Sequence, residues 1–194
     1  MKFQLGGLRI TLDFTFFAML GLFLYLDVSA DTWWMLSALT LHELGHLLAA
    51  RLAGIPMAEL SFSCFGVRLS RGDGAVGDWR RELLVYLGGP GMNLCWAALL
   101  LGLGREVPGA IHLVMGCFQL LPVGALDGGC ILGTLLERFA PPAHAREIGV
   151  IVSALALAPL FLLGWRLFRG VHQNFTLLVC CCFLMLSVLA EGIL

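Results

Sequence analysis

The stretch LTLHELGHLLAA, residues 39–50, places two histidines and a glutamate inside an apolar run. His42 and His46 are four residues apart, so on a helix they lie on one face. The pattern H-E-x-x-H is typical of a zinc site in which two imidazoles bind the metal and the glutamate acts as the base. Ionisable residues in a membrane-spanning segment are costly and usually mark function. The stretch therefore predicts His42 and His46 as zinc ligands and Glu43 as the catalytic base.

The composition of the chain favours a membrane protein. Of its 194 residues, 59% are hydrophobic and 13% are charged, and the mean hydropathy is +0.91. A soluble domain is about 45–50% apolar and about 25% charged. The net charge of −1 gives no indication of a nucleic-acid partner. We therefore expect an all-α integral membrane bundle that lies in a lipid bilayer.

Apolar segments long enough to cross a membrane recur along the whole chain. Six are predicted: about 8–29, 33–53, 82–103, 109–136, 148–168 and 174–193. The fourth is too long for one straight helix and contains Pro122 and Gly124, so a break is expected there. The sequence predicts a single domain, residues 1–194, with about six transmembrane helices.

The segment 54–81 has a different pattern. Apolar and polar residues alternate between residues 60 and 70, with a change of phase near residues 64–65. Period two predicts a β-strand, and the phase change predicts a bulge or turn. A β-hairpin near the cytoplasmic face and an ordinary interfacial loop both remain open.

The distribution of cations predicts the orientation. With a cytoplasmic N-terminus, only Arg105, Arg166 and Arg169 of the 12 Lys and Arg residues fall on the opposite side. The positive-inside rule then favours cytoplasmic N- and C-termini. We expect the chain to lie in a bacterial cytoplasmic membrane.

A catalytic zinc ion takes three protein ligands and keeps one open position. In LLPVGALDGGCIL, residues 120–132, Asp127 follows the predicted break and is the favoured third ligand. His112, His144 and His172 are the competing donors. His112 falls near the opposite face in this topology, and the other two fall in loops.

The depths of the polar motifs agree with this choice. At 1.5 Å per helical residue, His42 and Asp127 lie about 14–16 Å from their nearest cytoplasmic arginines. Asn93 lies about 18 Å deep by the same count. Three polar motifs therefore fall in one layer. The Asn93 amide is a candidate hydrogen-bond donor to the oxyanion.

Three motifs in this order resemble the site-2 protease family of intramembrane zinc metalloproteases. They are HELGH at 42–46, GGPGMN at 88–93 and LDGG at 126–129. The six-span form most resembles the short branch related to sporulation proteases. The resemblance implies regulated intramembrane proteolysis, which is cleavage within or next to the transmembrane segment of a membrane-tethered protein. It also implies one Zn²⁺ per chain on His42, His46 and Asp127.

One position departs from the family pattern. The family often has Asn eight residues before the aspartate, where this chain has Gln119. Gln119 keeps an amide on a longer arm and is a candidate substrate contact. A substrate must be unwound to an extended strand before cleavage, and an edge at about 57–70 is a candidate for pairing with that strand.

A zinc transporter or a metal-binding membrane protein is the alternative, because histidines in a helical bundle can conduct ions. Glu43 next to His42, at one shared site, favours hydrolysis. A homo-oligomer and a membrane regulator both remain open as partners.

Overall fold

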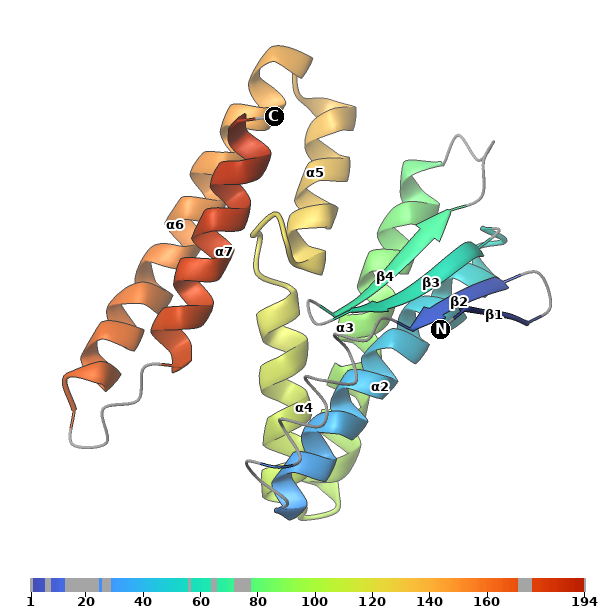
Figure 1. Cartoon of the computed structure of the whole chain (residues 1–194), viewed down its shortest axis with the longest axis vertical. Coiled ribbons are helices and arrows are strands. Elements are labelled where there is room, and N and C mark those ends of the chain that lie inside the picture. Colours follow the sequence, from blue (N-terminus) through green and yellow to red (C-terminus); the bar gives the residue numbers. More distant parts are fainter. Residues whose placement is uncertain are drawn as a thin grey trace. The chain divides into compact units, whose positions relative to one another are not determined.

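The computed structural model describes residues 2–5, 8–12, 25, 29–55, 57–63, 66–71, 78–170 and 176–193. The strands are β1 (Lys2–Leu5), β2 (Leu8–Leu12), β3 (Met57–Ser63) and β4 (Gly66–Arg71), and the helices are α2 (Ala30–Leu52), α3 (Trp79–Gly102), α4 (Glu106–Gln119), α5 (Asp127–Phe139), α6 (Pro142–Phe168) and α7 (Thr176–Ile193) (Figure 1). The chain divides into an N-terminal unit, Met1–Gly116, and a C-terminal unit, Cys117–Leu194. The single domain stays a prediction.

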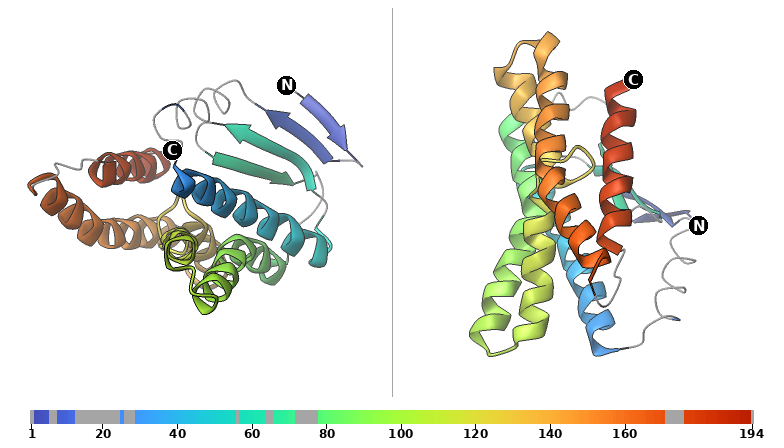
Figure 2. Two further views of the ribbon diagram at one scale, coloured as in Figure 1. Left: turned by 90° about the horizontal axis from the view of Figure 1, so that it is seen from below. Right: turned by 90° about the vertical axis from the view of Figure 1, so that its left-hand side faces the viewer.

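The N-terminal unit contains a four-stranded sheet with the order β1-β2-β3-β4 (Figure 2). β1 and β2 are antiparallel, β2 and β3 are parallel, and β3 and β4 are antiparallel. The segment that was predicted as a hairpin or a loop thus forms two paired strands, with Leu60 opposite Leu69. The phase change predicted near residues 64–65 lies outside the described residues. β4 is an edge strand of this sheet.

The predicted first span requires a correction at its beginning. Residues 8–12 were expected to be helical, but they form β2 and pair with β3. Leu8, Ile10 and Leu12 alternate with polar residues, which is the period of a strand. A count of apolar residues over a long window does not detect this period. The sheet is therefore larger than the expected hairpin, and the rest of that segment, except Tyr25 and Ser29, lies outside the described residues.

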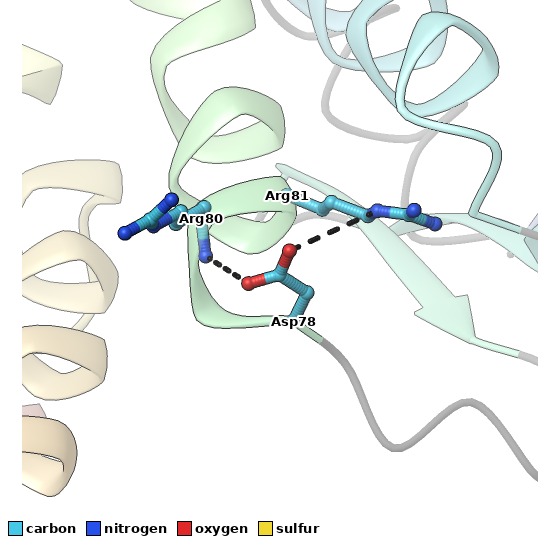
Figure 3. Close-up of polar contacts among 3 residues, drawn as sticks. All are labelled: Asp78, Arg80 and Arg81. Carbon is cyan, nitrogen blue, oxygen red and sulfur yellow. Dashed lines mark hydrogen bonds and ion pairs between the residues drawn. The ribbon is translucent and has the colours of Figure 1, made fainter.

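Helix α3 begins directly after its N-cap residue, Asp78. The Asp78 carboxylate accepts a hydrogen bond from the Arg80 backbone N–H at 3.2 Å and lies 4.0 Å from Arg81 Nε (Figure 3). Such a cap satisfies a backbone donor that the helix leaves unpaired. The pairing with Arg81 is solvent-exposed and contributes little. The cap therefore fixes where α3 starts.

Helices α2 and α3 lie side by side with their backbones in contact. A Cβ atom added to Gly88 would lie 2.6 Å from the Ala49 Cβ atom and 2.6 Å from the Gly45 carbonyl oxygen. Small residues allow helices in membranes to approach this closely. The glycines of HELGH and GGPGMN therefore allow the two helices that carry these motifs to pack in backbone contact.

The described helices include two that are long and apolar enough to cross a membrane by length and composition: α3 and residues His144–Phe168 of α6. Large apolar side chains are exposed on both helices, including Leu99, Leu155 and Leu162. An apolar surface of this kind suits lipid rather than water. The chain is an integral membrane protein, and the number of its spans stays a prediction.

The C-terminal unit packs around a core contributed by the segment after α4 and by helices α6 and α7. Its buried members are Val123, Leu126, Leu157, Leu184 and Val188. The break expected at Pro122 and Gly124 is confirmed, because α4 ends at Gln119 and α5 begins at Asp127. A Cβ atom on Gly128 would collide with the backbone of Leu120 and Leu121. The glycines of LDGG thus let the start of α5 lie against this segment.

Candidate metal centre

The two histidines of HELGH face one another inside the N-terminal unit. His42 and His46 are 1% and 8% exposed, and their Nε2 atoms are 3.1 Å apart. Two nitrogens that each lie 2.0–2.1 Å from a tetrahedral zinc ion are about 3.3 Å apart. The spacing therefore fits a metal that both imidazoles bind.

The His46 ring is anchored on the neighbouring helix. Its Nδ1 atom lies 2.7 Å from the backbone carbonyl oxygen of Val85 in α3. A carbonyl oxygen can only accept, so Nδ1 carries the hydrogen and donates it. Nε2 of the neutral ring then carries a lone pair and faces His42. Metal-binding histidines commonly have their second nitrogen held in this way.

Gly89 makes the space for both rings. A Cβ atom at this position would lie 2.7 Å from the His46 Cε1 atom and 2.8 Å from the His42 Cε1 atom. Any side chain larger than hydrogen would displace the imidazoles. The second glycine of GGPGMN is therefore part of the site, although the sequence pattern alone does not indicate a role for it.

Asn93 and His112 lie on the Nδ1 side of the His42 ring. Both side chains are fully buried. The Asn93 amide nitrogen lies 3.4 Å from His42 Nδ1, and its amide oxygen lies 3.0 Å from His112 Nδ1. His112 was considered as a competing ligand near the opposite face, and the structure instead brings it next to Asn93. The short turn between α3 and α4 indicates that the two residues can lie at a similar depth, and the packing of the two helices brings them into contact.

The remaining candidates lie elsewhere in the described residues. Glu43 follows His42 on α2 and is half-buried. Asp127 is the first residue of α5 and has a buried Oδ2 atom, and Gln119 is the last residue of α4. His144 is exposed on α6, and His172 lies outside the described residues. Asp127 and Gln119 belong to the C-terminal unit, so their roles at this centre stay predictions.

The donors fit zinc. Imidazole nitrogens and a carboxylate are the ligand types of catalytic zinc sites. The two rings are buried, one is anchored, and the backbone at Gly89 leaves room beside them. The pair in the N-terminal unit therefore fits a metal ion, and the roles of His42 and His46 as ligands stay predictions.

No protein-family model matches the chain. Two curated proteins, each carrying the name "Putative zinc metalloprotease", are similar to it. Rip3 of Mycobacterium tuberculosis is 24% identical over 177 residues, which cover 73% of this chain and 45% of Rip3. The protein sll0528 of Synechocystis is 29% identical over 134 residues, which cover 57% of this chain and 34% of that protein. The chain thus spans less than half the length of these relatives.

The fold is also similar to a solved structure. The site-2 protease from Methanocaldococcus jannaschii matches with a TM-score of 0.67 and 19% identity, over 99% of this chain and 94% of that one. The shared fold, the named relatives and the motifs HELGH, GGPGMN and LDGG agree. The chain therefore has the fold of a solved site-2 protease and is similar to proteins named zinc metalloproteases.

Proposed function

We propose that this chain is an intramembrane zinc metalloprotease that hydrolyses peptide bonds within or next to the transmembrane segments of membrane-tethered proteins. One observation carries the proposal: the buried Nε2 atoms of His42 and His46 are 3.1 Å apart, on a helix that also bears Glu43. The zinc metalloprotease names of the relatives support it.

The proposed ligands are His42, His46 and Asp127, with one zinc per chain. The imidazoles supply two neutral nitrogens and Asp127 supplies an anionic oxygen, which leaves one position of a tetrahedron open. Support for Asp127 comes from its place after the helix break and from its buried Oδ2 atom. When bound, zinc supplies Lewis acidity that polarises the scissile carbonyl.

Glu43 is the proposed general base and acid. Its carboxylate accepts a proton from the attacking water and later delivers that proton to the leaving amide nitrogen. Because Glu43 follows His42 directly, its side chain starts about 100° further around α2 and stays at the same depth. Glu43 can therefore exchange a proton with the attacking water and the leaving nitrogen without lying on the face of α2 that carries His42 and His46.

The proposed substrate is a membrane-tethered protein whose segment at the site is extended. A helical segment holds its own carbonyls in hydrogen bonds, so it must unwind before water can attack. The edge strand β4 offers backbone groups that support strand pairing with such a segment. Gln119, at the end of α4, is the proposed amide contact. Both termini are proposed to be cytoplasmic.

Purified protein in lipid vesicles tests the proposal against zinc transport. The probes are single-span test proteins labelled at both ends, together with a zinc-sensitive dye inside the vesicles. We expect cleavage in or beside the transmembrane segment, loss of cleavage with a zinc chelator, and no zinc uptake above protein-free vesicles. Zinc uptake without cleavage of any test protein would overturn the proposal.

A further inference from the structure

We propose that Ser37, His112 and Asn93 form a buried hydrogen-bond relay that fixes the proton of His42 on Nδ1 and leaves Nε2 ready for metal. Asn93 and His112 are then positioning residues rather than substrate contacts. The inference rests on the proposed function, because it concerns how the same site is prepared for zinc. All members lie in the N-terminal unit.

The relay begins at a backbone carbonyl. The Ser37 hydroxyl donates its one hydrogen to the Trp34 carbonyl oxygen, at 2.7 Å. The Ser37 oxygen can then only accept from any further partner. His112 Nε2 lies 3.5 Å from this oxygen. In the proposed relay, His112 Nε2 therefore carries a hydrogen and donates it to this oxygen.

The hydrogen on Nε2 of His112 determines the protonation of Nδ1 in the same ring. A neutral imidazole has one N–H, so Nδ1 of His112 carries a lone pair. Nδ1 lies 3.0 Å from one end of the Asn93 amide, while the other end lies 3.4 Å from His42 Nδ1. The structure places the amide oxygen at the end that faces His112, and the relay has the NH₂ group there instead. A half-turn about the last bond of Asn93 provides this arrangement, because it exchanges oxygen and nitrogen at nearly unchanged positions.

The amide oxygen of Asn93 then faces His42 and accepts from Nδ1–H. Nε2 of His42 consequently carries a lone pair, as Nε2 of His46 does through its bond to the Val85 carbonyl. Two backbone carbonyls, Trp34 and Val85, thus direct both lone pairs toward one point. Two lone pairs 3.1 Å apart repel one another, and a cation between them removes the repulsion.

The burial of Asn93 and His112 strengthens the hydrogen bonds of the relay. Asn93 and His112 are fully buried, so each of their polar atoms needs a protein partner. Trp96 stacks near His112, with ring centroids 6.4 Å apart and planes 28° apart, which restrains the ring. Because the NH₂ group of Asn93 is used on His112, it does not serve the oxyanion. The relay therefore replaces the oxyanion role that the sequence suggested for Asn93.

Zinc affinity, measured by competition with a chelator, separates these roles. Asn93→Ala should weaken zinc binding about 10–100-fold, as outer-shell partners of metal ligands do. Asn93→Asp should lose less zinc affinity than Asn93→Ala, because a carboxylate still accepts from His42 although it cannot donate to His112. An oxyanion donor would behave differently: Asn93→Ala would leave zinc affinity unchanged, and that result would overturn the relay.

Two further variants test the outer part of the relay. Ser37→Ala should weaken zinc binding severalfold, while Thr40→Ala should not. Thr40 is the matched control, because its hydroxyl also bonds a backbone carbonyl of α2, that of Leu36 at 2.8 Å. His112→Asn should retain most affinity, since its amide oxygen can replace Nδ1 as the acceptor. Equal losses in Ser37→Ala and Thr40→Ala would contradict the relay.

A measurement on the unaltered protein needs no variant to fold. In zinc-free, ¹⁵N-histidine-labelled protein, NMR should show His112 protonated on Nε2 and His42 protonated on Nδ1. His112 protonated on Nδ1 would overturn the relay alone, with zinc binding and cleavage by the wild type still intact. A wild-type protein that bound no zinc would instead overturn the proposed function.

Discussion

The His46 ring bridges two helices: it projects from α2 and donates through Nδ1 to the Val85 carbonyl of α3, at 2.7 Å. The same pair of helices is in backbone contact at Gly45 and Gly88. The Nε2 atoms of His42 and His46, which are the proposed metal ligands, are therefore positioned by the helix pair rather than by α2 alone. The glycines at this contact offer direct tests.

Gly89→Ala should damage zinc binding more than folding. The added methyl would meet the rings of His42 and His46, so we expect zinc affinity to fall about tenfold or more. Gly91→Ala is the matched control in the same motif, because a Cβ atom there meets nothing within 4 Å among the described residues. Isothermal titration with Zn²⁺ measures both. Equal zinc affinity in the two variants would show that the rings do not lie against Gly89.

Gly45→Ala should destabilise the N-terminal unit. A Cβ atom there would lie 2.8 Å from the Met92 Cβ atom and would collide with the Gly88 carbonyl. Overpacking of this kind costs roughly 1–3 kcal/mol. Thermal unfolding in detergent measures the loss, with Gly102→Ala as the control, because an added Cβ atom there meets nothing within 4 Å in the described part of the chain. An unchanged Tm for Gly45→Ala would contradict the backbone contact.

Removal of any one proposed ligand should abolish most zinc binding. We expect His42→Ala, His46→Ala and Asp127→Ala each to lose the metal on dialysis, because a site with two protein ligands holds zinc weakly. His144→Ala should keep it, since His144 is exposed on α6. Metal analysis of the purified variants measures how much zinc each one retains. Full zinc occupancy in Asp127→Ala, with ordinary affinity, would remove Asp127 from the ligand set.

Reporter fusions at each end of the chain should both give cytoplasmic signals. The expectation follows from the excess of arginine and lysine on one side of the predicted spans. Signals from opposite sides of the membrane would mean an odd number of spans, and the depth count that places Asp127 level with His42 would then be wrong.

Much of the helical architecture could be read from the sequence because it is local. Long apolar runs predicted the regions of α2, α3, α6 and α7, and Pro122 with Gly124 predicted the break before α5. The parallel pairing of β2 with β3 could not be read, since it joins residues 8–12 to residues 59–62 and no local pattern specifies the partner.

The candidate site also combines features that the sequence predicts with features that depend on helix packing. His42 and His46 share a face by their spacing alone, and that prediction needed no tertiary information. The contact of His112 with Asn93 depends on how α4 turns back along α3, so their sequence positions alone were not sufficient. The role of Gly89 depends on the crossing of α2 and α3. Helix packing therefore supplies what periodicity cannot.

Glu43→Gln tests the central claim most directly, because it separates metal binding from chemistry. Gln is nearly isosteric, and Glu43 is not a proposed ligand, so zinc content and Tm should match the wild type. Loss of the proton acceptor should slow cleavage of a labelled single-span test protein by about 10²–10⁴-fold or more. The paired measurement is zinc content and cleavage rate on one preparation. Normal zinc with cleavage at near wild-type rate would contradict the proposed mechanism.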